Sequence, residues 1–215
     1  MTAQEIIKKY KHVIWDWNGT LLDDVQLCVD IINHILEKRN LKPLTVERYK
    51  NIFTFPVVDY YGAAGLDVSG NNFEIMSHEF IGEYESRKLD CSLFKGGREV
   101  LELFNKNNLT QSVLSAYSQH TLEEIINHFG LTNYFIKLVG LNNIYAASKL
   151  ENGKKWIKEL NLNPKEVLMF GDTLHDLEVA KEMGIDCILF SSGHQSKEKL
   201  SASGIKVIKS HFDLI

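Results

Sequence analysis

Hydrophobic residues recur along the chain with two different periods. Short apolar runs alternate with longer segments in which apolar positions fall three and four residues apart, the spacing of a helix with one buried face. The predicted strands span residues 13–15, 111–115, 136–140, 167–170, 187–190 and 206–208, and predicted helices span 2–10, 121–129, 149–160 and 173–183, with one more through 100–104. Strands separated by helices form right-handed crossovers and a parallel sheet. The pattern therefore predicts a doubly wound α/β fold.

One long stretch interrupts this alternation. Between residues 24 and 93 the apolar spacing is helical and no strand is predicted, with helices expected at 24–40, 45–53, 56–64 and 71–88. A helical block that follows the first strand of an α/β core is an insertion into that core. We therefore predict two domains, an α/β core of residues 1–23 and 94–215 and an all-helical cap of residues 24–93.

Charge, apolar runs and cysteine spacing argue against several classes of partner. The chain has 215 residues and a formal net charge of −4, without a basic stripe carrying interleaved aromatic residues, so we expect no nucleic-acid partner. No apolar run approaches the ~20 residues of a membrane span, and residues 1–12 contain no apolar signal core. The three cysteines, Cys28, Cys91 and Cys187, are widely spaced and suit free thiols in a reducing compartment. We expect a cytoplasmic protein without a membrane partner, present as a monomer or weak dimer.

Polar residues stand at the ends of the predicted core strands. Asp16 follows the first strand and opens a turn that contains Asn18, and Ser115 closes the strand at 111–115. Lys149 begins a helix, and Asp172 follows the strand at 167–170. The carboxyl ends of parallel strands meet at one edge of the sheet, where ligands bind in open α/β folds. We therefore expect these groups to converge.

Each of these residues also has a purely structural interpretation. Ser115 suits a simple turn, and the spacings Ser148-x-x-Glu151 and Thr173-x-x-Asp176 suit capping boxes at helix starts. A lysine in a first helical turn, however, opposes the helix dipole and is favourable only near an anion or a cluster of carboxylates.

Two carboxylates at adjacent strand ends provide the stronger signal. Asp16 and Asp172 need either a cation between them or a raised pKa. A site with oxygen ligands and several waters suits Mg²⁺. The sequence therefore predicts a magnesium site at this edge of the sheet.

The order of these four motifs, with a helical insertion after the first, resembles the haloacid dehalogenase superfamily of hydrolases over essentially the whole chain. Within it the chain most resembles the phosphoglycolate-phosphatase-like branch. The resemblance implies that Asp16 is a nucleophile that forms an aspartyl-phosphate. It implies that Ser115 and Lys149 hold the phosphoryl oxygens, with Ala116 beside them in the substrate site.

The same resemblance implies a ligand set for Mg²⁺. Asp16 and Asp172 would bind the ion directly, and Asp176 would support the metal site without contacting the ion itself. The backbone carbonyl of Asn18 would be the third protein ligand, and Asn18 would also contact the substrate. The expected activity is a Mg²⁺-dependent phosphatase of a small phosphorylated metabolite, a phosphate ester.

Asn18 departs from the pattern of these phosphatases. Most of them have an aspartate there, which acts as general acid and then as general base. An amide cannot exchange a proton at neutral pH, so a factor of roughly 10²–10⁴ in rate is missing or comes from elsewhere. His194 is the candidate for a substitute proton donor, whereas His175 reads as a polar surface group. A catalytically weak or inactive relative that binds a phosphorylated ligand or partner is the main alternative.

A second enzyme activity also stays open. Phosphonoacetaldehyde hydrolases lack an aspartate at the position of Asn18, but they need a cap lysine that forms a Schiff base. The candidate lysines do not differ by context from ordinary surface lysines; they are Lys38, Lys42, Lys50 and Lys88. The break between helices at residues 53–56 is a candidate for substrate contact, although an ordinary helix–helix turn fits it as well.

Overall fold

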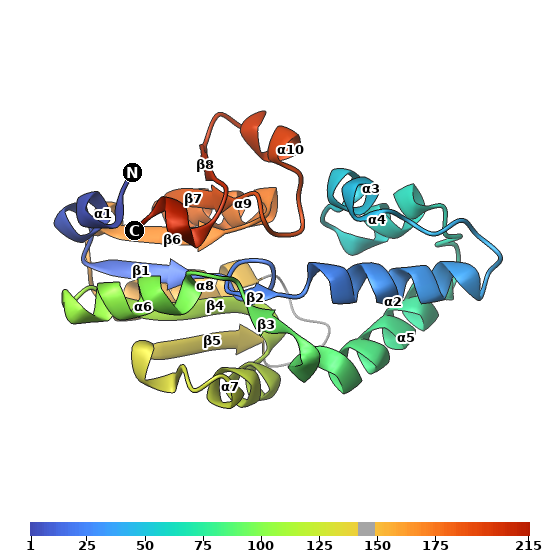
Figure 1. Ribbon diagram of the computed structural model, residues 1–215, viewed down its shortest axis with the longest axis horizontal. Helices are drawn as coiled ribbons and strands as arrows, with labels where there is room; N and C mark the ends of the chain where they lie inside the picture. Colours follow the sequence, from blue (N-terminus) through green and yellow to red (C-terminus); the bar gives the residue numbers. More distant parts are fainter. Residues whose placement is uncertain (142–148) are drawn as a thin grey trace.

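A central parallel sheet organises the molecule (Figure 1). The computed structural model describes residues 1–141 and 149–215, and in these residues six strands pair in the order β5–β4–β1–β6–β7–β8. β1 therefore lies inside the sheet, paired in parallel with β4 on one side and β6 on the other. The strands are β1 (His12–Trp15), β4 (Thr110–Ser118), β5 (Lys137–Leu141), β6 (Val167–Gly171), β7 (Asp186–Phe190) and β8 (Lys206–Ile208).

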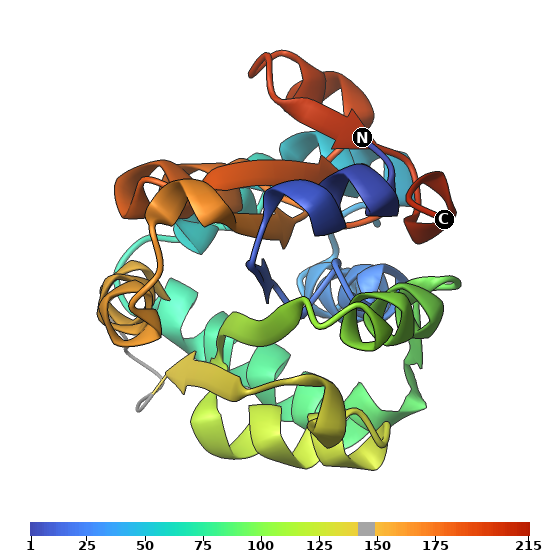
Figure 2. The ribbon, with the colours of Figure 1, turned by 90° about the vertical axis from the view of Figure 1, so that its left-hand side faces the viewer.

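Both faces of this sheet are buried, because alternate side chains of each strand enter different hydrophobic clusters. In β1, Val13 and Trp15 belong to one cluster, whereas Ile14 belongs to the other. Figure 2 shows helices on both sides of the sheet. Trp15 stacks on Phe170 of the neighbouring strand with 4.5 Å between ring centroids. The prediction of a doubly wound α/β fold is confirmed.

Apart from α1, which precedes β1, the helices of this core lie between strands in sequence. They are α1 (Ala3–Lys9), α6 (Gly97–Lys106), α7 (Gln119–His128), α8 (Lys149–Leu160), α9 (Leu174–Met183) and α10 (Lys197–Ser201). Short 3₁₀ turns are η1 (Lys88–Asp90), η2 (Thr132–Tyr134), η3 (Pro164–Glu166) and η4 (His211–Asp213).

Helices α2 to α5 form a separate unit, which we call the helical unit. They are α2 (Val25–Glu37), α3 (Val46–Ile52), α4 (Val57–Ala64) and α5 (Asn72–Arg87). The unit has a hydrophobic cluster of its own, centred on the apolar face of α2. Figure 1 shows it beyond the arrowheads of the core strands, so it lies at the carboxyl edge of the sheet.

A short antiparallel ladder joins the two ends of the helical unit. β2 (Leu22–Asp23) pairs with β3 (Ser92–Leu93) where the chain enters and leaves the unit. The prediction that no strand occurs between residues 24 and 93 is therefore wrong at its last two residues. A two-residue strand is too short to show the alternation by which strands are predicted.

The sequence predicts no membrane-spanning segment, and the lengths and compositions of the helices can be compared with that prediction. None of the helices in residues 1–141 and 149–215 is both long enough and apolar enough to cross a bilayer.

Candidate active site

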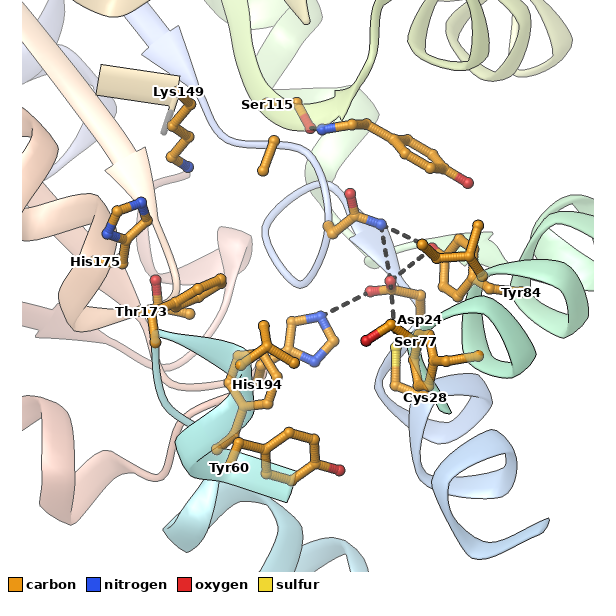
Figure 3. Close-up of a pocket in the computed structure, with 18 of the residues that line it drawn as sticks. Asp24, Cys28, Tyr60, Ser77, Tyr84, Ser115, Lys149, Thr173, His175 and His194 are labelled. Atoms are coloured by element: carbon orange, nitrogen blue, oxygen red, sulfur yellow. Dashed lines mark hydrogen bonds and ion pairs between the residues drawn. The ribbon is translucent and has the colours of Figure 1, made fainter. Parts of the chain in front are cut away.

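The polar residues predicted to converge do line one cavity of about 710 Å³ between the sheet edge and the helical unit. The predicted site residues among its lining are Asp16, Asn18, Ser115, Ala116, Lys149, Asp172 and Asp176. In Figure 3, Lys149, Ser115 and Thr173 of the core lie on one side of the cavity, and Tyr60 and Tyr84 of the helical unit lie on the other.

Lys149 lies between two buried carboxylates. Its Nζ donates to Oδ1 of Asp16 at 2.7 Å and also to Oδ1 of Asp176, and all three side chains are nearly inaccessible to solvent. Burial opposes the charge on the ammonium, yet the two carboxylates raise the pKa of Lys149 above its usual value. This pairing explains why a lysine is placed in the first turn of α8 against the helix dipole.

Asp16 and Asp172 carry more negative charge than the lysine neutralises. Carboxylate oxygens of Asp16, Asp172 and Asp176 lie within 4.8 Å of one another. Burial raises the pKa of Asp16 to about 6, even though Lys149 opposes this shift. Burial raises the pKa of Asp172 to about 8, although the neighbouring His194 opposes this shift. A cation bound between Asp16 and Asp172 would relieve this repulsion.

Glycines make room for the Asp172 carboxylate. A Cβ atom at Gly19 would lie 2.3 Å from Oδ2 of Asp172, and one at Gly193 would lie 2.2 Å from the same oxygen. Gly19 also has a φ of +69°, which favours glycine. The backbone N–H of His194 donates to Oδ2 of Asp172 at 2.6 Å. The loop after β7 therefore closes tightly over Asp172.

Asp176 is held by its own helix start. Its Oδ2 accepts hydrogen bonds from the backbone N–H of Thr173 at 2.9 Å and from the Thr173 hydroxyl at 2.7 Å. Burial opposes ionisation of Asp176, but Lys149 lowers its pKa below the usual value. The predicted capping box at Thr173 is confirmed. The other predicted box begins at Ser148, which lies outside the described residues.

The Asn18 side chain turns toward the buried carboxylate of Asp24, which precedes α2. Its Nδ2 donates to Oδ2 of Asp24 at 2.9 Å and to the Tyr84 hydroxyl at 2.7 Å, and that hydroxyl donates to the same Asp24 oxygen at 2.7 Å. Because a carboxylate only accepts hydrogen bonds, this network fixes the orientation of the amide. The other oxygen of Asp24 accepts from the backbone N–H of Gly19 at 2.9 Å.

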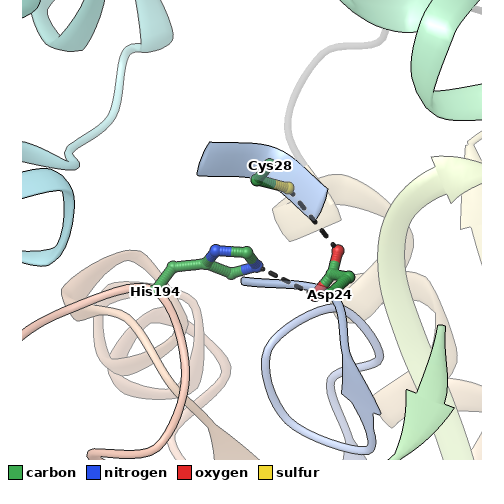
Figure 4. A group of neighbouring side chains, drawn as sticks. All are labelled: Asp24, Cys28 and His194. Atoms are coloured by element: carbon green, nitrogen blue, oxygen red, sulfur yellow. Dashed lines mark hydrogen bonds and ion pairs between the residues drawn. The ribbon is translucent and has the colours of Figure 1, made fainter. Parts of the chain in front are cut away.

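His194 joins the same network from the core. Its Nε2 lies 3.2 Å from Oδ1 of Asp24, and its Nδ1 lies 2.8 Å from the Tyr49 hydroxyl. Burial opposes protonation, but the Asp24 carboxylate raises the pKa of His194 to about 9, so the imidazole carries a charge at neutral pH. Cys28 lies beside them, with Sγ 3.8 Å from Asp24 (Figure 4). The His194 imidazole and the Asp24 carboxylate therefore form a buried ion pair.

Asp24 and its aromatic partners were not predicted from the sequence. Asp24 precedes α2 in the position of an N-cap, yet its side chain makes no capping hydrogen bond and is 1% exposed. An acidic residue before a helix usually signals a cap, so its position did not indicate a buried network. Tyr84 and Tyr49 come from helices of the helical unit, where aromatic residues at helical spacing read as core.

Ser115 and His175 both lie at the cavity wall. Oγ of Ser115 accepts a hydrogen bond from the backbone N–H of Tyr117 at 3.1 Å, at the cavity wall. Its strand, β4, extends three residues past it, whereas the prediction ended there. His175 also lines the cavity, where its ring lies 4.8 Å from that of Phe55. The helix break at residues 53–56 therefore does reach the site.

Residues 13–190 match the sequence model of the haloacid dehalogenase-like hydrolases. The chain belongs to this family. The predicted resemblance is confirmed, and this haloacid dehalogenase-like hydrolase falls in the phosphatase branch of the family.

Three similar proteins illustrate its place in the family. The hydrolase is 27% identical to an N-acetylmuramic acid 6-phosphate phosphatase of Pseudomonas putida, over 82% of this chain and 80% of that protein. It is 23% identical to a phosphoglycolate phosphatase of Chromobacterium violaceum, over 91% of both chains. The crystal structure of a predicted phosphatase from Clostridium acetobutylicum superposes with a TM-score of 0.80 at 18% identity, covering 95% of this chain and 96% of the other. This last likeness shows the shared fold.

Proposed function

We propose that this hydrolase is a Mg²⁺-dependent phosphatase of a small phosphorylated metabolite that acts through an aspartyl-phosphate on Asp16. One observation carries the proposal: the buried carboxylate of Asp16 faces a cavity, paired with Lys149 and close to a second carboxylate with a raised pKa. A carboxylate attacks a phosphate dianion only if the charge repulsion between them is cancelled. Lys149 supplies one positive charge for this purpose.

The donor set fits a hard divalent cation. Asp16 and Asp172 offer buried carboxylate oxygens that lie within 4.8 Å of each other, and oxygen ligands of this kind suit Mg²⁺. We assign these two residues and the backbone carbonyl of Asn18 as the protein ligands. Asp176 supports the site by holding Lys149. When bound, Mg²⁺ neutralises charge on the phosphoryl group and polarises its oxygens.

The covalent step then follows from the chain's own residues. A carboxylate oxygen of Asp16 forms a bond to phosphorus while the bond from phosphorus to the leaving-group oxygen breaks. Lys149 donates to the phosphoryl oxygens, and Ser115 and the backbone beside Ala116 hold the same group at the carboxyl end of β4. The leaving-group oxygen takes a proton from solvent. Water then forms a bond to phosphorus while the bond from phosphorus to Asp16 breaks, which releases inorganic phosphate and restores the carboxylate.

The helical unit, residues 24–93, acts in this proposal as a cap on the core formed by residues 1–23 and 94–215. Helices α4 and α5 supply one wall of the cavity, opposite the residues that hold the phosphoryl group. A closed cap excludes bulk water and contacts the leaving group.

Two alternatives have different support. A weak or inactive relative that binds a phosphorylated ligand is favoured by Asn18, whose amide donates to Asp24 and cannot serve as an acid. A phosphonoacetaldehyde-hydrolase-like activity would need a cap lysine at the site. Lys149 of the core is the only lysine among the described residues that line the cavity, and Lys88 and Lys50 are engaged elsewhere.

The test is hydrolysis of a panel of phosphate monoesters with and without Mg²⁺. Asp16→Asn should lower Mg²⁺-dependent phosphate release to background, because an amide is not a nucleophile. Asp59→Asn, an exposed carboxylate of the helical unit, is the matched control and should retain activity. If no ester is turned over, or if Asp16→Asn retains full activity, the proposal is wrong and the binding function gains support.

A further inference from the structure

Aromatic rings form the wall of the cavity that faces the phosphoryl site. They come from the segment between α3 and α4, from α4, from α5 and from β4. The rings include Phe53, Phe55, Tyr60, Phe73, Phe80 and Tyr117. Figure 3 places Tyr60 across the cavity from Lys149 and Ser115. A leaving group attached to a phosphate held at Asp16 would therefore extend toward this wall.

These rings support one another, so the wall is formed before a ligand arrives. Phe53 packs edge-on against Phe55 with 5.6 Å between centroids and contacts Tyr60 at 5.2 Å. Tyr84 meets Tyr117 of the core edge-on at 5.8 Å. Such pairs hold side chains in fixed orientations, which lowers the entropy lost when a flat group binds.

Apolar surface remains uncovered around this cavity. Phe55 is 38% exposed and Ile81 is 43% exposed, and both line the cavity. Large apolar side chains that line a concave site gain free energy when an apolar ligand covers them.

Charge argues against an anionic leaving group. Lys149 is the only lysine, and no arginine occurs, among the described residues that line the cavity. The segment 142–148, whose placement is not described, contains neither residue in its sequence. Lys149 is already shared between Asp16 and Asp176, and the His194 imidazole is paired with Asp24. A carboxylate on the leaving group would instead meet Glu74, and Glu85 on the same helix is already paired with Lys88.

The volume of the cavity also favours a leaving group larger than two carbons. A cavity of about 710 Å³ lies well inside the range of ~300–1,000 Å³ that holds whole organic ligands. A leaving group of two carbons would leave most of the aromatic wall exposed.

We propose, resting on the phosphatase function above, that the preferred substrate is a phosphate monoester whose leaving group is uncharged and carries an aromatic ring. The ring would stack against the cap aromatics, while the phosphate is held at Asp16 and Lys149.

Three alkyl esters with similar chemistry at the reacting oxygen test this preference: 2-phenylethyl phosphate, ethyl phosphate and phosphoglycolate. Burial of the phenyl ring should raise kcat/KM for the first ester roughly 10- to 100-fold above that for ethyl phosphate. Phosphoglycolate should be the poorest substrate. If phosphoglycolate is preferred, or if the phenyl ring gives no gain, the inference is wrong while the phosphatase function stands.

A matched pair of variants on α5 locates the effect. Ile81→Arg places a cation at the cavity wall, whereas Ile75→Arg places one on the same helix at a 52% exposed position outside the cavity lining. Ile81→Arg should lower kcat/KM for 2-phenylethyl phosphate and raise it for phosphoglycolate, each by roughly tenfold. Ile75→Arg should change neither; equal effects of the two variants would refute the placement of the leaving group.

A binding experiment separates this inference from the proposed activity. Calorimetric titration with the non-hydrolysable 3-phenylpropylphosphonate, propylphosphonate and 3-phosphonopropanoate measures the same preference without turnover. Tighter binding of the phenyl compound supports the inference even if no ester is hydrolysed. Equal or weaker binding of the phenyl compound overturns it.

Discussion

Replacement of Lys149 by methionine should destabilise the protein far more than replacement of an ordinary paired lysine. Lys149 is 3% exposed and is the positive charge that Asp16 and Asp176 share. Methionine preserves the length and apolar stem of the side chain but removes the charge. The variant then contains two buried carboxylates with no lysine between them.

The distance between the charges determines how much stability Lys149→Met should lose. At 2.7 Å and an effective dielectric constant of ~20, the attraction between Lys149 and Asp16 alone is about 6 kcal/mol. Part of this is offset by the desolvation of both groups in the native protein. Removing one partner of a buried pair typically costs about 3–5 kcal/mol. For a chain of this size such a loss lowers Tm by roughly 6–20 °C.

The same helix offers a control. Lys154 of α8 also forms an ion pair, with 3.0 Å between its Nζ and Oε2 of Glu182, but the two side chains are 37% and 60% exposed. Lys154→Met should cost under about 1 kcal/mol.

Urea unfolding of wild type and both variants, without added metal and followed by tryptophan fluorescence, measures the difference. Added Mg²⁺ should restore stability to Lys149→Met more than to Lys154→Met, because the buried carboxylates then gain a cation. If the two variants lose equal stability, the charge on Lys149 does not hold the site together and the reasoning fails.

Three further predictions concern the metal, the amide and a buried histidine. Asp172→Ala should weaken Mg²⁺ binding in a calorimetric titration, and equal affinity in variant and wild type would contradict the ligand assignment. Asn18→Asp should raise turnover, most for esters with poor leaving groups. Combining it with Asp24→Asn should raise turnover further, because the single variant places two carboxyl groups 2.9 Å apart. Unchanged rates on both alkyl and aryl esters would show that the proton comes from elsewhere. Burial lowers the pKa of His211 from 6.5 to about 4, so the unfolded chain binds a proton in this range that the native state does not. His211→Phe should therefore gain up to about 3 kcal/mol relative to wild type as the pH falls from 6.5 to 4, measured by urea unfolding, and a constant difference would refute it.

Residues that follow core strands could be predicted because topology alone brings them together. Asp16 and Asp172 each come directly after an apolar strand, and parallel pairing places both at one edge of the sheet. Lys149 could be predicted because its position in a first helical turn is unfavourable without nearby anions.

The contacts made by the helical unit could not be predicted in this way. Tyr84 meets Asn18 across 66 positions of sequence, through the angle at which α5 packs beside α2. Neither the hydrophobic period nor the composition of a helix determines that angle. The aromatic residues of the cavity wall have the same spacing as core residues, so only the structure separates the two roles.

The close approach of Asn18 and Asp24 constrains how this protein changes by mutation. Their side chains lie 2.9 Å apart in a buried network, where one amide and one carboxylate complement each other. Two carboxylates would repel, and two amides would leave His194 without its counter-charge. The two positions therefore change most favourably as a pair, and any path of single substitutions that moves the acid from one to the other passes through a disfavoured intermediate sequence.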